Sequence, residues 1–408
     1  MSDTPSNPFA NLTAPTAGPI GAPSAISGGN GGGPTGPSGG GDAQRAKINR
    51  FTPLEFTGTA SQLFGIQMLN LFLIIITLGV WTPWARVRRR RFFFNSTTIL
   101  GEGIDYTATG FTLFKGWAIV SLLLIAFYTL PFLGVPFAQE GLAVLVLPAY
   151  PWVINRSLRF NAQNTAWRDV RFNFKGSYFG SLWYLFLLPI IGVFSLGLLL
   201  PLASKAMREY IARNYAFGTA SFSSNAGVAA YYGAGVKSLL VFILMIAALF
   251  AAIWGVVSGF TDFDLTTLIE HLGYDAQGNM KDGSPIFISI ASFVPFALLA
   301  LFLITTTYYR ALTRNIMVGA LRLDGGVKFR STISGSILAW ITISNVVLTI
   351  VTVGLLWPWA QVRRYRYMTE STEIRPINDL KGFIDKERAA GNALGDAFGE
   401  AGNIDIQF

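Results

Sequence analysis

Residues 77–92 read Thr-Leu-Gly-Val-Trp-Thr-Pro-Trp-Ala-Arg-Val-Arg-Arg-Arg-Arg-Phe, and residues 352–367 read Thr-Val-Gly-Leu-Leu-Trp-Pro-Trp-Ala-Gln-Val-Arg-Arg-Tyr-Arg-Tyr. Both stretches follow an apolar segment, and both place a glycine, a proline, a tryptophan and a group of arginines at the same spacing. The agreement extends upstream, because Asn70 and Asn345 precede the two stretches by the same distance. Such agreement indicates an internal repeat, which is sought before any other feature of a fold.

Two weaker copies lie between these stretches. The third copy keeps Ser195, Gly197 and Pro201, but it has Leu202 in place of the tryptophan and lacks the pair of arginines. A fourth region repeats only the second half of the pattern, through Pro151, Trp152, Arg156, Arg159 and Phe160. The repeated unit is therefore predicted to be a membrane segment followed by a basic turn.

The composition indicates a membrane protein. Of the 408 residues, 51% are hydrophobic and 13% are charged, and the mean hydropathy is +0.45, which is too apolar for a soluble globular chain. A bilayer core of roughly 30 Å needs about 20 mostly apolar residues for each spanning helix. Candidate segments lie at 61–84, 116–133, 137–154, 178–203, 236–259, 286–309 and 334–359.

The basic residues predict the topology. They cluster beside the apolar segments at 86–91, 156–175, 205–213, 310–330 and 363–366, and such clusters favour the cytoplasmic side. Seven alternating spans cannot place all five clusters on one side. We therefore expect re-entrant hairpins or broken interfacial helices at 61–84, 178–203 and 334–359, four spanning segments, and external loops at 134–140 and 260–285. The alternative is seven complete helices with some basic loops exported.

The fold class follows from these patterns. Polar stretches after each copy alternate like strands, as in Val170, Phe172 and Phe174. We expect an all-α polytopic membrane protein with internal repeats and short β-hairpin-like cytoplasmic segments between its membrane helices. Its parts are a disordered Gly/Pro/Ser-rich tail (1–50), a repeated transmembrane domain (51–373) and a polar, partly helical C-terminal tail (374–408).

The repeated motif resembles one known family. The Thr-Leu-Gly, Pro-Trp-Ala, Val-Arg and Arg-Tyr elements at 77–92 and 352–367 are similar to those of the YjgN-like family of bacterial inner-membrane proteins, a domain of unknown function (898). The resemblance covers roughly residues 51–373. It implies a multi-pass protein of the bacterial inner (plasma) membrane with its basic loops in the cytoplasm, and it implies no particular chemistry.

Several polar and aromatic residues of the repeat are candidates for function. Asn70 and Asn345 lie inside apolar segments, where an amide needs a partner, and hydrogen bonding between helices is favoured over substrate contact. Thr77 and Thr352 precede a glycine by two residues, where a hydroxyl can bond carbonyls freed at a helix break. The tryptophans beside the basic clusters are expected to be interfacial anchors; they are Trp84, Trp152 and Trp359.

The arginines of the repeat have two interpretations. If the first and last copies pack together, Arg88 and Arg89 converge with Arg363 and Arg364 on a phosphate or carboxylate. Ordinary positive-inside anchoring explains the same residues without a pocket and is favoured. A third interpretation, intermediate between a pocket and anchoring, is binding of anionic phospholipids. The candidate residues for binding a lipid or an anion are Arg88, Arg89, Arg91, Arg363, Arg364 and Arg366.

Other chemistries lack support. The chain has no cysteine and a single histidine, His271, so thiolate sites and multi-histidine metal sites are excluded. The acidic residues near His271 lack a recognised ligand spacing, and no Walker-type phosphate loop occurs. The net charge of +9 belongs to clusters beside apolar segments, which points to lipid headgroups and not to nucleic acid. We expect no cofactor, no metal and no enzymatic activity.

Two functions are compatible with these features. The first is transport or permeation of a small solute or lipid, because internal repeats and broken helices are common in transporters. Ion-coupled pumping is disfavoured, since the apolar segments contain almost no ionisable residues. The second is a non-transporting structural or scaffold protein that binds anionic lipids or partner proteins through its basic cytoplasmic face.

Overall fold

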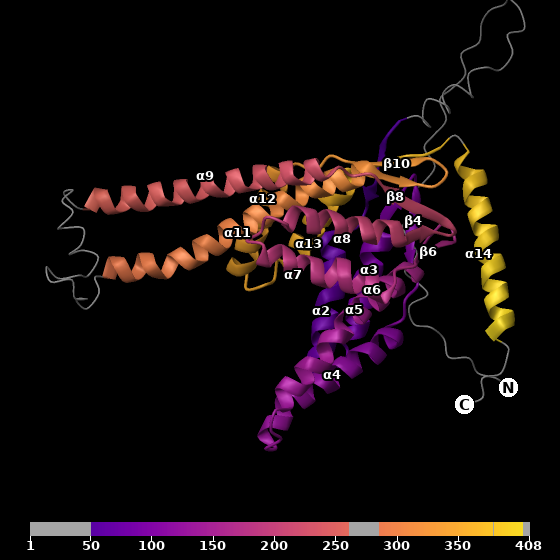
Figure 1. Cartoon of the computed structure of the whole chain (residues 1–408), viewed down its shortest axis with the longest axis horizontal. Coiled ribbons are helices and arrows are strands. Elements are labelled where there is room, and N and C mark those ends of the chain that lie inside the picture. Colours follow the sequence, from indigo (N-terminus) through magenta and orange to yellow (C-terminus); the bar gives the residue numbers. More distant parts are fainter. Residues whose placement is uncertain (1–49, 261–284, 378, 403–408) are drawn as a thin grey trace, which may run out of the picture. The chain divides into compact units, whose positions relative to one another are not determined.

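The computed structural model describes residues 50–260, 285–377 and 379–402. In this part of the chain, two helices followed by two short strands form an order that recurs four times (Figure 1). A fifth pair of helices is followed by the single strand β11 (Thr372–Arg375) and then by the long helix α14 (Leu380–Gly402).

The helices are paired in sequence, and in three pairs the second residue of the second helix is a proline. Pro83, Pro201 and Pro358 occupy first-turn positions, where the missing N–H leaves no intrahelical bond unmade. The pairs are α2 (Ala60–Ile76) with α3 (Thr82–Asn95), α4 (Gly110–Phe132) with α5 (Ala138–Gln163), α6–η1–α7 (Tyr178–Ser181, Leu182–Leu187, Leu188–Phe194) with α8 (Leu200–Asn214), α9 (Val228–Phe260) with α11 (Pro285–Ala320), and α12 (Gly335–Val351) with α13 (Trp357–Glu370).

The strands correct the all-α fold class expected from the sequence. They do not form separate hairpins between helices but join in one antiparallel sheet of eleven strands, in the order β1-β11-β10-β9-β8-β7-β6-β5-β4-β3-β2. The protein is therefore mixed in secondary structure. The remaining strands are β1 (Thr52–Pro53), β2 (Glu55–Phe56), β3 (Thr97–Ile99), β4 (Glu102–Tyr106), β5 (Thr165–Trp167), β6 (Val170–Phe174), β7 (Tyr215–Phe217), β8 (Ala220–Ser224), β9 (Leu321–Leu323) and β10 (Val327–Ser331).

The two ends of the strand order are neighbours in the sequence. β1 pairs with β11 through Thr52 and Ile374, whereas β2 pairs with β3 through Phe56 and Thr97, and only Leu54 separates β1 from β2. The N–H of Leu54 also donates to the carbonyl of Thr372, at 2.8 Å. The sheet is thus closed on itself by one covalently continuous segment.

One hydrophobic core unites the sheet and α14. Trp167, Phe217, Val327 and Ile374 are buried in it, and these residues come from β5, β7, β10 and β11. Ile384 of α14 is buried in the same cluster. Burial of apolar side chains from the successive hairpins against one helix supplies about 25 cal/mol per Å² removed from water, which holds these short strands together.

Two side chains of α14 bind hairpin turns of the sheet. The buried Glu387 carboxylate accepts hydrogen bonds from the N–H groups of Thr219 (2.6 Å) and Ala220 (3.1 Å) in the β7–β8 hairpin, and from the Thr219 hydroxyl (2.7 Å). Arg388 donates to the carbonyl of Arg168 (2.9 Å) in the β5–β6 turn. The C-terminal helix is therefore an integral part of the sheet's core.

The helices include fewer candidate spans than the sequence indicated. In the described residues, three helices are long and apolar enough to cross a bilayer: Gly110–Phe132, Val228–Gly255 and Ser292–Ala320. The expected span 137–154 lies in α5, which does not meet this criterion. The segments 61–84, 178–203 and 334–359 contain shorter apolar helices, Ala60–Ile76, Tyr178–Phe194 and Gly335–Val351. The polytopic arrangement is thus corrected to three candidate spans.

The first and last helix pairs lie against each other. α13 packs against α2, and the side chain of Gln67 on α2 donates to Gln361 on α13 at 3.3 Å. The Thr97 and Tyr365 hydroxyls are 3.1 Å apart in the same region. This contact between residues about 300 positions apart creates the cavity described next.

Candidate functional site

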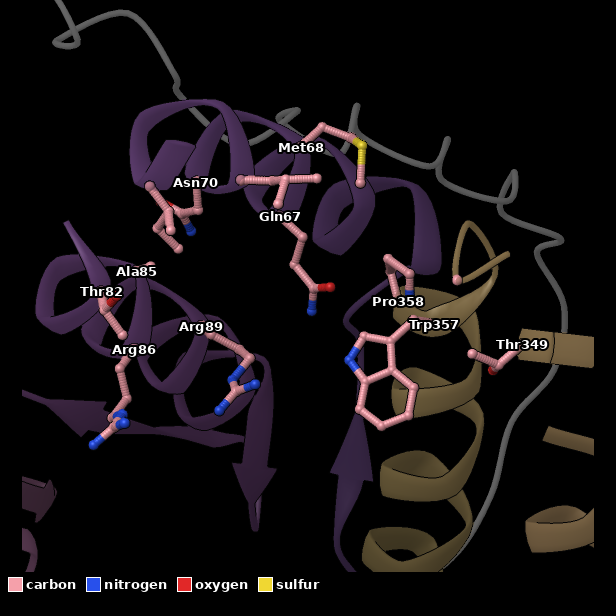
Figure 2. A pocket seen from close by; sticks show the side chains of 13 residues that line it. Gln67, Met68, Asn70, Thr82, Ala85, Arg86, Arg89, Thr349, Trp357 and Pro358 are labelled. Atoms are coloured by element: carbon pink, nitrogen blue, oxygen red, sulfur yellow. The ribbon is translucent and has the colours of Figure 1, made fainter. Parts of the chain in front are cut away.

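A cavity of about 520 Å³ lies between the first and last helix pairs. Its volume is within the range of sites for small ligands, about 300–1,000 Å³. Figure 2 shows that α2 and α3 supply one side and the turn into α13 supplies the other. The lining residues are Gln67, Met68, Asn70, Leu71, Ile74, Thr82, Ala85, Arg86, Arg89, Thr349, Gly354, Trp357 and Pro358.

The basic side of the cavity consists of Arg86 and Arg89. They lie three positions apart on α3, so they occupy one face of that helix. Burial lowers the pKa of Arg89, and the neighbouring charges of Arg86 and Arg90 lower it further. No ion pair neutralises either arginine within the described residues. An anion in the cavity would relieve this repulsion.

The other walls are apolar. Met68, Leu71 and Ile74 extend along α2, and Trp357 stands opposite Arg89 with Pro358 beside it (Figure 2). Gln67 reaches into the space between the two sides. The site combines two cations with a hydrocarbon-like surface, which is the chemistry of an amphipathic anion.

The two repeated asparagines hold helix pairs together. The Asn70 side-chain oxygen accepts from the indole N–H of Trp81 (3.4 Å), in the turn after its own helix. Asn345 donates to the carbonyl of Ala360 (3.0 Å) and accepts from Arg363 (3.3 Å). Both are buried. Asn70 also borders the cavity, whereas the polar atoms of Asn345 bond to α13.

The repeated hydroxyls satisfy the backbone of three matching turns. Thr77 donates to the carbonyl of Leu73 (2.7 Å) and accepts from the N–H of Trp81 (3.0 Å). The hydroxyls of Thr352 and Ser195 accept equivalent bonds from the N–H groups four residues later, at 3.2 and 2.9 Å. Each hydroxyl thus compensates the helix break in its own chain segment.

The same three turns share a backbone geometry. Leu78, Leu196 and Val353 have φ values of 49°, 54° and 50°, and each is followed by a glycine that also has a positive φ. A left-handed conformation disfavours residues with a Cβ, so the following glycine reduces the cost of the reversal.

The three predicted tryptophan anchors have different surroundings. Trp84 stacks on Trp81, with ring centroids 5.3 Å apart, and packs over Gly110 at the start of α4. Trp359 is half-buried, and Trp152 is 59% exposed on α5. Trp84 therefore packs between helices, while the anchor role of the exposed Trp152 stays a prediction.

The predicted arginines separate into different contacts. Arg88 lies over the ring of Trp81, 5.4 Å from its centroid, and Arg363 lies over Trp359 at 5.2 Å. Cation–π contacts of this kind fix both guanidinium groups beside tryptophan rings. Arg364 is not among the residues that line the cavity, and burial lowers its pKa, as does the nearby charge of Arg310. The four arginines therefore do not converge on one ligand, and only Arg89 lines the cavity described above.

Arg91 and Arg366 make matching bonds to the backbone. Arg91 donates to the carbonyl of Ala108 (3.0 Å), and Arg366 donates to the carbonyl of Gly58 (2.9 Å). With Arg363, Arg366 also borders a second cavity of about 460 Å³ at the start of α2. Sequence reasoning did not select Arg86 for the main cavity, although its spacing of three from Arg89 placed both on one helical face.

The described part of the chain contains no candidate metal site. Within the described residues, no group of three or more His, Cys, Asp or Glu side chains is arranged to hold an ion. His271 and the acidic residues near it, and most of the expected external loop 260–285, lie outside the described residues. So does almost all of the expected N-terminal tail 1–50.

Comparisons with known proteins connect this geometry to membrane proteins. The chain is 24% identical over 388 residues to "Inner membrane protein YjgN" of Salmonella typhimurium, covering 85% of this chain and 94% of the relative. It is 22% identical over 374 residues to the protein of that name in Escherichia coli O157:H7, covering 81% and 90% of the two chains. A third relative, from Escherichia coli strain K12, is 30% identical over 157 residues, which cover 37% of this chain and 38% of the relative.

No solved structure gives a significant match. The family model described as "Bacterial protein of unknown function (DUF898)" matches residues 51–401. The match covers most of the chain and confirms the resemblance to YjgN-like proteins that the repeated Thr-x-Gly and Pro-Trp-Ala motif indicated. The chain therefore belongs to the DUF898 family of bacterial proteins.

Proposed function

We propose that this protein is a lipid-binding protein of the bacterial inner membrane, and that it holds an anionic phospholipid in the cavity between its first and last helix pairs. The observation that carries the proposal is the pairing of Arg86 and Arg89 with the apolar wall of Met68, Leu71 and Ile74. Guanidinium groups bind phosphate by charge-assisted hydrogen bonds, and the apolar wall suits an acyl chain.

The proposed orientation in the membrane follows from the same residues. The basic helices α3, α8 and α13 and the sheet face the cytoplasm, where anionic headgroups attract Lys and Arg. Each short apolar helix has 17 residues, or about 25 Å, which is less than the roughly 30 Å of hydrocarbon. These helices therefore enter the membrane without crossing it.

The recurring helix and strand order is part of the proposal. We attribute it to an internal repeat, supported by the identical turn geometry at Leu78, Leu196 and Val353. The repeat would place equivalent arginines at several positions around the sheet, of which Arg86 and Arg89 line the cavity beside the last copy.

Lipid binding is favoured over solute transport by the repeated polar residues. A solute path needs polar groups free to contact the solute, but Thr77, Thr352 and Asn345 bond to their own helix pairs. Asn70 alone of these four borders the cavity, and it already accepts from Trp81. Of the two functions that the sequence allowed, we therefore propose the non-transporting one, in which the protein binds anionic lipids.

The test uses the tryptophan in the cavity wall. Brominated phosphatidylglycerol and brominated phosphatidylcholine are titrated against the purified protein, and quenching of tryptophan fluorescence is measured. The part of the quenching that disappears in Trp357→Phe is assigned to this site. We expect tighter binding of phosphatidylglycerol, and in Arg86→Gln/Arg89→Gln we expect that preference to fall at least tenfold. Arg88→Gln is the matched control, because Arg88 lies on the same helix over Trp81. An unchanged preference in the double variant would contradict the proposal.

A further inference from the structure

A third cavity, of about 510 Å³, lies where the second helices of four pairs meet the sheet. Its wall includes Phe94 from α3, Asn161 from α5, Arg208 from α8 and Met317 from α11, together with strand residues such as Phe222. It shares no residue with the cavity that contains Arg86 and Arg89. It is therefore a separate site and goes beyond the phospholipid site proposed above.

Most of the wall is apolar. Phe94, Phe172, Phe222, Ile211 and Met317 present rings and alkyl groups to the space. Sites that bury small ligands are mostly apolar with a few placed polar groups, and methionine adapts to irregular ligand shapes. The body of the ligand is therefore expected to be hydrocarbon.

Among the residues that line this cavity, one is charged, and it is an arginine. Arg208 lines the cavity, and Arg90 donates to Asn161, which also lines it. Arg314 on α11 donates to the hydroxyls of Ser331 (3.1 Å) and Thr372 (3.0 Å). These three arginines make no ion pair with any described residue.

The acidic residue next to Arg208 in the sequence is already engaged. Glu209, next to Arg208, pairs with Lys205 at 2.7 Å and with Arg213. Partly buried cations without a counter-charge are unfavourable, because burial disfavours the charged form and like charges repel. Arg208 is therefore not paired with a carboxylate of the described residues, and an anionic ligand can supply its counter-charge.

A neutral hydrogen-bond donor completes the site. Tyr215 lines the cavity, and burial raises the pKa of its phenol, although the charge of Arg90 acts in the opposite direction. The phenol therefore stays protonated at neutral pH and can donate to an anionic oxygen.

From this arrangement we infer that the cavity binds a single-chain amphipathic anion, such as a fatty acid, with its acidic group at Arg208 and its chain against the phenylalanines. A free phosphate would leave the apolar wall without a contact. A fatty alcohol would leave the arginines without a counter-charge. The combination of the two surfaces requires both properties in one molecule.

The experiment compares dodecanoate, dodecanol and inorganic phosphate by native mass spectrometry of the full chain released from a mild detergent. We expect dodecanoate to bind, dodecanol to bind at least tenfold more weakly, and phosphate not to bind. This comparison needs no variant and so does not depend on folding of a mutant. Equal binding of dodecanoate and dodecanol would overturn the inference.

Variants locate the site. Arg208→Gln is expected to weaken dodecanoate binding at least tenfold, while Arg213→Gln, on the same helix but 65% exposed and paired with Glu209, leaves it unchanged. Arg86→Gln/Arg89→Gln also leaves it unchanged, which separates this site from the phospholipid site. Dodecanoate binding that survives Arg208→Gln, or that is lost in Arg86→Gln/Arg89→Gln, would refute the assignment.

Discussion

The guanidinium of Arg366 donates to the carbonyl oxygen of Gly58 at 2.9 Å, across 308 positions of sequence. The bond between Arg91 and Ala108 has the same form, at 3.0 Å over 17 positions. Both carbonyls lie two residues before the first residue of a helix, Ala60 in one case and Gly110 in the other. The same arginine bond therefore joins one helix pair to the next and the last pair to the first.

Arg366→Gln is expected to weaken the closure of the fold. The loss of one charged hydrogen bond to a partly exposed carbonyl should lower the free energy of unfolding by about 1–2 kcal/mol. Thermal unfolding in detergent measures the effect. Arg330→Gln is the control and should change stability less, because the Arg330–Glu373 ion pair spans 3.9 Å and the Arg330 side chain is 59% exposed. Equal effects of both variants would argue against a special role for Arg366.

Glu387→Ala is expected to destabilise the sheet. Its buried carboxylate accepts three hydrogen bonds in the β7–β8 hairpin, so its removal leaves two backbone N–H groups unpaired. We expect a loss of about 1.5–3 kcal/mol in the free energy of unfolding. Glu373→Ala removes a carboxylate of β11 that is not placed in a turn, and a similar loss there would show that the Glu387 contacts have no particular importance.

Thr77→Val and Thr352→Val should affect stability but not ligand binding. Each removes a hydroxyl that bonds backbone groups of a helix turn, so each should cost about 0.5–1.5 kcal/mol. Quenching of Trp357 fluorescence by brominated phosphatidylglycerol should be unchanged in both variants. A change in lipid preference without a change in stability would instead place these hydroxyls in a ligand path.

Arg89→Lys should make lipid binding dependent on pH. Burial and the charges of Arg86 and Arg90 lower the pKa of Arg89, and the same surroundings should lower the pKa of a lysine below its usual value of about 10.4. The cation is present below that lowered pKa and is lost as the pH rises through it. Phosphatidylglycerol preference of the variant should fall as the pH rises, with a midpoint below the usual lysine pKa of about 10.4. The wild type should stay constant over this range, and a parallel fall in both proteins would exclude Arg89 as the titrating group.

The sequence predicts local features of this fold well. The Thr-x-Gly pattern at Thr77 and Thr352 indicates a helix break, and a turn lies at each position. The alternation of Val170, Phe172 and Phe174 indicates a strand, and β6 occupies that segment. These features depend on residues within a few positions of one another, so periodicity and turn chemistry are sufficient to find them.

The sequence does not predict how the hairpins pair. Tyr106 of β4 pairs with Thr165 of β5, and the intervening helix pair gives no signal for that register. β1 has two residues, one of them Pro53, so no alternation marks it. The all-α expectation failed for this reason, because each strand seemed to belong only to its own hairpin.

The candidate site was only partly predictable. The first and last helix pairs do pack together, but Arg88 and Arg363 lie over tryptophans, which the spacing of charges alone cannot reveal. Arg208 lies in the degenerate copy and belongs to no repeated arginine pair, so it became a candidate only through the cavity that it lines. Side-chain direction after packing, and not residue type, decides these roles.

The pairing of β1 with β11 constrains how this protein is synthesised. Thr52 leaves the ribosome some 320 residues before its partner Ile374, and until then the strands beside the gap have unpaired N–H and C=O groups. Such edges are prone to pair with other chains. Newly made copies therefore pass through a period in which neighbouring nascent chains can supply the missing strand, and dense translation of one messenger brings more such chains together.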